Sequence, residues 1–397
     1  MRNLNLAAIL LAGLLLATTG CGKIPTWGEL TGQAQTQQAP AKPVQVAPQM
    51  AHADVAPPKV TEPSPDEVIA RFSSLQGSQI TDGSLFELTS LKEGADRVTE
   101  INADNSPLTK NAFEHIDRLT GLRQLRLNRT LIDNDVCQKL ASLTSLEVLA
   151  LADTQVTDVG IAALSGLQNL KHLELTRCRI SENGFHAIGN LPSLKTILID
   201  STSLNDRSLD LLCNASTLTE LTLSRNAISD FGLTALKKLE PLEYLEIGNT
   251  GISGEGLSKL TKGGGLKNLR YLGVYACPIT EKGAKAISTI KSLEQLNIGS
   301  VPMMNDVGLA SIIGGMKNLK YINLSLCVGL DGSGLKVLKN SKEMEVVLID
   351  QCPKVGDGVI SILKTMKNLK RVGLGSTAVT PRGRQELKSA LPDAEIF

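Results

Sequence analysis

The sequence predicts an α/β solenoid, a horseshoe in which a parallel sheet lines the concave face and helices cover the convex face. Two observations carry this prediction. A leucine-rich unit recurs about every 24 residues from Val98 onward, which is typical of a repeat architecture. Each unit joins one strand pattern to one helix pattern. Such a unit cannot bury its apolar face alone, so its copies must stack.

The units share the frame LxxLxLxx[C/T/N]x[I/V/L][T/S]xxGLxxLxxLxx. Seven of the first eight intervals between repeat starts are 24 residues; the exception gains three at glycines 263–265, and the last three intervals are 26, 25 and 25. We place the twelve repeat starts at Val98, Leu122, Leu146, Leu170, Leu194, Leu218, Leu242, Leu269, Leu293, Leu319, Met344 and Leu369. Together these repeats predict one elongated domain.

Residue periodicity assigns the two halves of each unit. In LxxLxL the leucines alternate, so they point to one side of a short strand. The Ser or Thr that follows is a good helix N-cap, and Thr380 is followed by proline at the first helical position. We expect first-turn acidic residues such as Asp158 and Asp230 to interact favourably with the helix dipole. The GLxxLxxL part then predicts a helix with one buried face.

Residues 1–21 have the pattern of an export signal. An apolar run from Leu4 to Ala17 is too short to span a bilayer and fits the core of a signal peptide. Gly20 and Cys21 resemble the bacterial lipobox, in which the cysteine is lipidated and becomes the new N-terminus. The resemblance implies a lipid anchor at Cys21 in a bacterial cell envelope, either periplasmic or surface-exposed. An ordinary signal peptide is the alternative.

Three further segments follow the signal. Residues 22–65 hold eight of the sixteen prolines, together with many Gln and Ala, and this composition predicts a disordered tether. Residues 66–97 are expected to form an N-terminal cap and a half-repeat. Residues 98–397 are expected to form the twelve repeats and a C-terminal cap.

The repeat resembles the leucine-rich-repeat family, in particular its cysteine-containing subtype, which shares a fold with ribonuclease inhibitor. CPITEKGAKAI at 277–287 and CPKVGDGVISIL at 352–363 carry the cysteine of that subtype and the segment that follows it. The resemblance covers about three quarters of the chain and implies the horseshoe fold. The residues before the repeats show no F-box-like helical pattern, so the ubiquitin-adaptor role of some relatives is not implied.

The cysteines are predicted to be free thiols. Cys178, Cys277, Cys327 and Cys352 share the ninth position of their repeats, which elsewhere holds mostly Thr. We expect this position to turn inward, where a small thiol packs and bonds to backbone. Cys327 and Cys352 lie on adjacent repeats, near the distance of a disulfide, and we expect them to stay unbridged.

The sequence offers no catalytic constellation. It contains no CxxC pair, HExxH helix, Walker loop or GxSxG turn, and its four histidines are scattered. We therefore predict no catalytic residue, no metal site and no cofactor, and we do not expect an enzyme. A formal net charge of +1 argues against a nucleic-acid partner.

The residues between the inward leucines, at positions three, five and seven of each repeat, are expected to face the concave side; we call them the concave columns. All four tyrosines lie in these columns. Gly248, Gly273 and Gly299 lie among them and predict a shallow pocket with a polar edge. Tyrosine favours strands, so cross-strand packing is the alternative role. The predicted partner-binding residues are Tyr244, Glu246, Tyr271, Tyr275, Gln295, Asn297, Tyr321 and Asn323.

These patterns predict a monomeric, non-enzymatic binding module anchored to the membrane by its N-terminal lipid. Its partner is expected to be a protein or peptide on the concave face, because tyrosine is enriched in binding hot spots. Two alternatives remain open. One is a structural or adhesive envelope protein that binds through its convex or lateral surface. The other is a carbohydrate-binding surface protein, since tyrosines beside Asn and Gln suit stacking on sugars.

Overall fold

The computed structural model describes residues 63–340 and 342–397, so the expected signal peptide, Cys21 and nearly all of the tether lie outside the described residues. The described chain contains one sheet of thirteen strands, whose order in the sheet follows their order in the chain. The strands are β1 (Glu100–Asn102), β2 (Gln124–Arg126), β3 (Val148–Ala150), β4 (His172–Glu174), β5 (Thr196–Leu198), β6 (Glu220–Thr222), β7 (Tyr244–Glu246), β8 (Tyr271–Gly273), β9 (Gln295–Asn297), β10 (Tyr321–Asn323), β11 (Val346–Leu348), β12 (Arg371–Gly373) and β13 (Glu395–Ile396).

Helical elements precede β1 and then connect the successive strands. The α-helices are α2 (Pro65–Ser73), α3 (Asp82–Thr89), α4 (Asn134–Leu140), α5 (Asp158–Ala163), α6 (Glu182–Gly189), α7 (Asp206–Leu212), α8 (Glu255–Lys262), α9 (Glu281–Ile287), α10 (Asp306–Ile313), α11 (Ile360–Leu363) and α12 (Pro381–Ala390). The 3₁₀-helices are η1 (Gly77–Gln79), η2 (Ala95–Arg97), η3 (Lys110–Phe113), η4 (Ile116–Arg118), η5 (Leu164–Gly166), η6 (Gly232–Lys238), η7 (Ser333–Asn340) and η8 (Asp357–Val359). Some repeats therefore use a 3₁₀-helix where others use an α-helix.

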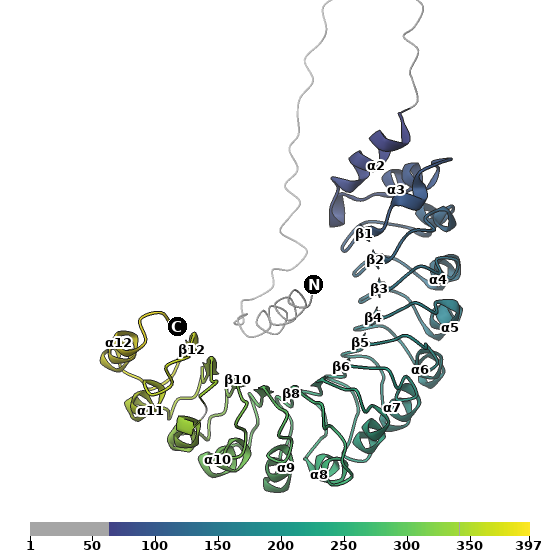
Figure 1. Ribbon diagram of the computed structural model, residues 1–397. Coiled ribbons are helices and arrows are strands. Elements are labelled where there is room, and N and C mark those ends of the chain that lie inside the picture. The colour runs from purple at the N-terminus through teal and green to yellow at the C-terminus, as the bar shows by residue number, and fades with distance from the viewer. Residues whose placement is uncertain (1–62, 341) are drawn as a thin grey trace, which may run out of the picture. The chain divides into compact units, whose positions relative to one another are not determined.

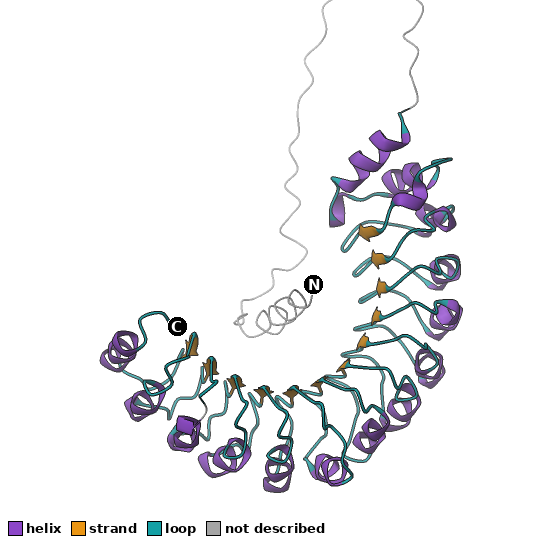
Figure 2. Cartoon of the chain, viewed as in Figure 1, coloured by secondary structure: helices purple, strands orange, loops and turns teal. Residues whose placement is uncertain are grey.

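Neighbouring strands are parallel and keep one register along the sheet. Tyr244 pairs with Tyr271, and Tyr271 pairs with Gln295. In the row of repeats, the strands lie on the inner side and the helices on the outer side (Figures 1 and 2). The middle residue of each three-residue strand is buried, as the alternating leucines predict. The structure confirms the predicted α/β solenoid.

A left-handed residue ends the sheet-facing part of every repeat. The eighth position has φ between 53° and 64° in all twelve repeats, and none of the twelve residues is glycine. This conformation costs an L-residue about 1–2 kcal/mol. Hydrogen bonds between repeats offset the cost, because the N–H of the eighth residue donates to the carbonyl of the seventh residue of the next repeat. Asn249 N and Tyr275 O, for example, are 2.7 Å apart.

The ninth position turns into the core, as predicted. Thr154 Oγ1 donates to the carbonyl of Leu151 at 2.7 Å, and Cys178 Sγ of the next repeat donates to the same oxygen at 3.1 Å. Cys327 and Cys352 are buried free thiols, like the other described cysteines. Burial raises the pKa of Cys327 to about 12, so these thiols are unreactive packing groups.

The acidic residues at the start of the convex elements bond to the next repeat, a contact that the sequence did not predict. Asp230 accepts N–H groups of the following repeat, from Ser253 at 3.1 Å, Gly254 at 3.1 Å and Gly256 at 2.9 Å. Asp158 similarly accepts the N–H and the hydroxyl of Ser181. Asp158 lies in the first turn of α5, where it was predicted, whereas Asp230 precedes η6; both carboxylates also link their repeat to the next one.

This contact between repeats also explains the glycine of the repeat frame. A Cβ on Gly256 would lie 2.3 Å from the carbonyl oxygen of Asp230, and one on Gly383 would lie 2.3 Å from Oδ1 of Asp357. At these two positions glycine lets the helix start approach the preceding repeat closely enough for these bonds. By contrast, Thr280 caps its own helix through Gly283, as predicted for this position.

The extra glycines lie away from the sheet. Helix α8 ends at Lys262, the glycines 263–265 follow, and β8 begins only at Tyr271. Although Tyr244 and Tyr271 are farther apart in sequence than other paired residues, their strands pair without a shift. The insertion therefore changes the return loop and leaves the concave columns in register.

Candidate binding surface on the concave face

The structure gathers the predicted partner-binding residues on four adjacent strands, β7 to β10. The third column runs through Tyr244, Tyr271, Gln295 and Tyr321, which pair in this order. The fifth column runs through Glu246, Gly273, Asn297 and Asn323. Tyr275 follows β8 in the seventh column. All eight predicted side chains are half-buried, so they form one partly open surface.

Two tyrosines form a stacked pair at the centre of this surface. The rings of Tyr244 and Tyr271 are nearly parallel, at 6°, with centroids 4.0 Å apart. The Tyr271 hydroxyl donates to Oε2 of Glu246 at 2.7 Å. Cross-strand packing, the alternative role for these tyrosines, is therefore part of what they do. The stack also holds both rings rigid, which lowers the entropy cost of binding against them.

The predicted shallow pocket over the glycines is wrong. A Cβ on Gly248 would lie 2.1 Å from Cε1 of Tyr275, so the tyrosine ring already covers this glycine. A Cβ on Gly273 would lie 2.0 Å from Oε2 of Glu246, so the carboxylate fills that space. The glycines make room for neighbouring side chains of this surface. The result is a filled aromatic and polar surface with no cavity above the glycines.

The acid–base state of this surface favours hydrogen-bond donation by the tyrosines. Burial raises the pKa of Tyr321 to about 12. Burial, followed by the nearby charge of Glu246, also raises the pKa of Tyr244 and of Tyr271. Burial also raises the pKa of Glu246 to about 7, although hydrogen bonds from Tyr271 and Gly248 oppose the shift. Glu246 can therefore change its charge near neutral pH.

Amide side chains occupy the other half of the surface. Oδ1 of Asn297 accepts the N–H of Gly299 at 3.2 Å, and Oδ1 of Asn323 accepts the N–H of Ser325 at 2.9 Å. These bonds fix both side chains. Within the described chain, neither amide nitrogen has a hydrogen-bond partner, and Gln295 makes no side-chain hydrogen bond. Three amides thus offer donors to a bound molecule.

Two carboxylates next to the tyrosines were not among the predicted site residues. Glu220 pairs in register with Tyr244 and accepts the Thr196 hydroxyl at 3.3 Å. Asp200 accepts the N–H of Ser224 at 2.6 Å, and burial raises its pKa to about 6. The sequence places Glu220 and Asp200 in the concave columns. Their closeness to the tyrosine hydroxyls could not be predicted, because it depends on how the strands pack side by side.

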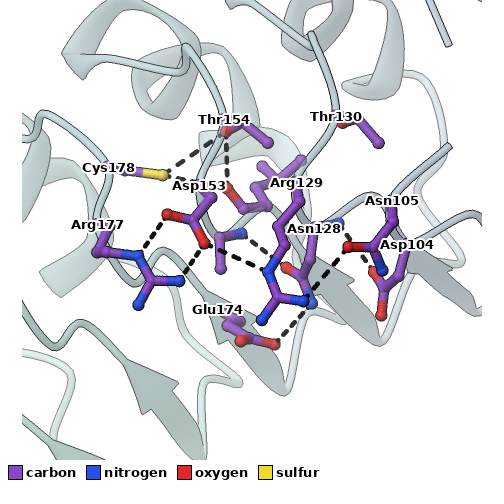
Figure 3. A network of polar contacts seen from close by, with 12 residues as sticks. Asp104, Asn105, Asn128, Arg129, Thr130, Asp153, Thr154, Glu174, Arg177 and Cys178 are labelled. Carbon is purple, nitrogen blue, oxygen red and sulfur yellow. Dashed lines mark hydrogen bonds and ion pairs between the residues drawn. The ribbon is translucent and has the colours of Figure 1, made fainter. Parts of the chain in front are cut away.

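Charged residues nearer the N-terminus mainly satisfy one another, as Figure 3 shows. Asp153 lies between Arg129 and Arg177 and forms ion pairs with both. Asn128 donates to Glu174 at 3.2 Å and accepts the N–H of Ala152 at 2.7 Å. The alternating Arg and Asp residues thus satisfy one another, and this network gives no reason to place a ligand there.

The loop between β9 and α10 exposes only one of its two methionines. Met303 is 77% exposed, but Met304 is only 4% exposed and packs in the core. Leu326 and Val328, in the next repeat, are also exposed. This edge therefore offers a few exposed apolar side chains beside Tyr321 and Asn323.

Two features are absent from the described residues, a membrane-spanning helix and a metal-binding cluster. None of the helices between residues 63 and 397 is both long and apolar enough to cross a membrane. In the same part of the chain, no three His, Cys, Asp or Glu side chains are grouped so that they could hold a metal ion.

Comparisons with known proteins agree with this architecture. Family models described as leucine-rich repeat match residues 142–165, 169–191, 214–237 and 238–260. An internalin structure from Listeria monocytogenes has a TM-score of 0.52 at 19% identity, over 84% of this chain and 93% of its own. A leucine-rich-repeat protein from Leptospira interrogans has a TM-score of 0.50 at 19% identity, over 81% of each chain.

No curated protein sequence matches this chain. The similar solved structures share its fold at low identity, and the matching models describe its repeats. The fold thus defines a repeat protein of the α/β solenoid class. The chain is a leucine-rich-repeat protein.

Proposed function

We propose that this protein is a monomeric, non-enzymatic binding module whose concave face binds a protein or peptide. Leucine-rich-repeat proteins typically bind proteins, and the family match supports this part of the proposal. One observation carries the choice of site: rigid stacked tyrosines lie beside the unpartnered amide nitrogens of Asn297 and Asn323 on one sheet face. Aromatic area with nearby hydrogen-bond donors is the chemistry of a binding hot spot.

A peptide-display library tests this proposal. The full chain is immobilised and challenged with random peptides, in parallel with the double variant Y271A/Y275A. We expect the wild type to enrich peptides that the double variant binds at least about tenfold more weakly, because the variant loses two aromatic anchors. Phe231→Ala is the matched control, since Phe231 is 78% exposed and lies on the 3₁₀-helical half of its repeat.

Two results would contradict the proposal, and a third would change the variant that tests it. Failure to enrich any peptide would argue against peptide binding, and a glycan array would then test sugars as the ligand. Equal binding by Y271A/Y275A and the wild type would place the site elsewhere. A loss of circular-dichroism signal in the double variant would show that these tyrosines mainly stabilise the fold; the milder variant Y271F, which keeps the ring, would then carry the binding test.

We also propose that the binding module is tethered to a bacterial cell envelope through a lipid on Cys21. The apolar run before Gly20 and Cys21 supports this anchor, and the proline-rich residues 22–65 suit a spacer between the membrane and the repeats. Cys21→Ser tests the anchor. We expect wild-type protein from bacterial cells to partition into detergent and to show the added mass of acyl chains, and the variant to show neither. An unacylated wild type would refute it.

A further inference from the structure

The middle of the concave face carries acidic side chains and no strong base. In the nine repeats from β3 to β11, the concave columns contain no Lys or Arg. His172 is there, but burial lowers its pKa to about 4, so it is neutral at pH 7. Arg126 and Arg371 lie in the repeats on either side. The carboxylates in these columns are Glu174, Asp200, Glu220, Glu246 and Asp350.

Three of these carboxylates surround the stacked tyrosines. The charges of Glu246, Asp200 and Glu220 all act on the Tyr244 hydroxyl. Tyr271 covers one face of the Tyr244 ring, with the centroids 4.0 Å apart. Because β7 lies between β6 and β8, the other ring face is turned toward β6, where Glu220 holds the matching position. An aromatic face and a carboxylate thus lie side by side.

The partners of these carboxylates within the described chain are neutral groups. Glu220 accepts the Thr196 hydroxyl, and Glu246 accepts the Tyr271 hydroxyl and the N–H of Gly248. Asp200 accepts a hydroxyl and a backbone N–H. Two basic groups act on parts of this region: Arg225, at the left-handed eighth position, acts on Asp200 and Tyr275, and Arg371 acts on Tyr321. Among the described residues, no basic group acts on Glu220 or Glu246 as a countercharge.

We infer that the segment bound on this face presents a lysine or arginine side chain to Tyr244, between Glu220 and Glu246. This inference rests on the proposed binding of a peptide to the concave face and names its chemistry. A cation over a tyrosine ring is attracted by the ring quadrupole, and half-buried carboxylates without countercharge strengthen that attraction. The amides of Gln295, Asn297 and Asn323 then lie where they can bond to the main chain of the same segment.

Charge complementarity favours this partner over other ligands. An acidic segment would bring like charges against Glu220 and Glu246 in a partly dehydrated site, which is unfavourable. A neutral sugar would cover the same carboxylates without supplying a countercharge. A basic extended segment supplies a countercharge to the carboxylates and main-chain groups to the amides.

The test uses defined probes with the full chain. A fluorescein-labelled hexa-arginine peptide is titrated by fluorescence anisotropy, and hexa-citrulline, which has nearly the same shape without the charge, is its control. We expect hexa-citrulline to bind at least about tenfold more weakly. We expect the E220Q/E246Q variant to lose about as much affinity for hexa-arginine. Glutamine keeps the shape and the acceptor oxygen, so folding should be retained.

Glu100→Gln is the control variant. Glu100 occupies the third column on β1, as Glu220 does on β6, but it is exposed and away from the tyrosines. It should change hexa-arginine binding by less than about twofold. Equal binding of hexa-arginine by E220Q/E246Q and the wild type would overturn the inference, as would an equal loss in E100Q, which would indicate attraction to overall charge. Display peptides that depend on Tyr271 and Tyr275 but lack Lys and Arg would also overturn it, while leaving the proposed function intact.

Discussion

The Glu246 carboxylate fills the space above Gly273, and the residue is half-buried on the concave face of the sheet. Burial raises its pKa from 4.5 to about 7. The folded chain therefore keeps a proton that the unfolded chain releases between these values. This contributes stability below pH 4.5 that is lost as the pH rises through about 7.

Glu246→Gln should consequently stabilise the protein more at pH 8 than at pH 5. We expect a gain of about 2 kcal/mol at pH 8, less than the full pKa shift implies because the group is only half-buried. Urea unfolding of both proteins at the two pH values measures it. The raised pKa values of Asp200, Glu174 and Glu220 are common to both proteins and largely cancel. A pH-independent difference would show that Glu246 titrates normally.

The Tyr275 ring lies in close contact with Gly248, and replacing this glycine tests that contact. A Cβ at this position would overlap the ring, which must then move away from its neighbours. We expect Gly248→Ala to lower the free energy of unfolding by about 1–3 kcal/mol. Gly166→Ala is the control, because a Cβ there meets nothing within 4 Å. If the two variants have the same stability, the ring moves freely and the surface is softer than the structure indicates.

At the scale of the elements, hydrogen bonds between repeats matter more than the capping of single helices. Burial raises the pKa of Asp230, but hydrogen bonds from Ser253, Gly256 and Gly254 outweigh it and hold the pKa below its usual value. The carboxylate therefore stabilises the fold above its usual pKa, and this contribution is lost as the pH falls into the acid range.

Asp230→Ala should leave three N–H groups of the next repeat without their acceptor. We expect a loss of about 2–4 kcal/mol in urea unfolding at pH 7. Asp230→Asn should recover most of it, because Asn134 accepts the N–H groups of Thr157 and Gly160 in just this way. Glu255→Ala is the control, since its ion pair with Lys282 is exposed and its loss should cost less than about 1 kcal/mol. Equal losses in D230A and E255A would refute this role.

At the scale of the whole molecule, each repeat contacts mainly its neighbours, so damage should stay local. Asp357 accepts the N–H and hydroxyl of Thr380, both at 2.8 Å, and so holds α12 to the preceding repeat. Asp357→Ala should speed hydrogen exchange after residue 357 and leave β4 protected as in the wild type. Hydrogen-exchange mass spectrometry measures both regions at once. Uniformly faster exchange would show that the solenoid unfolds as one unit.

The solenoid could be predicted from the sequence because leucine alternation and the 24-residue period both follow from burial. The columns of Tyr244 and Tyr271 followed from the same register. The filling of the space over Gly248 could not be predicted, since it depends on how the Tyr275 ring packs across strands. The left-handed conformation of the eighth position could not be predicted either. The residues found there, such as Arg129, Ser201 and Leu326, share no preference for that conformation.

The return loop at glycines 263–265 also makes the molecule easy to modify. Three added residues there leave Tyr244 opposite Tyr271, and Gly264 already has a positive φ of 75°. Foreign sequence of moderate length should be tolerated in the same loop, because closing a longer loop costs little free energy. A fluorescent label or affinity tag inserted at this point would report on the protein in cells while the strands and their columns keep their order.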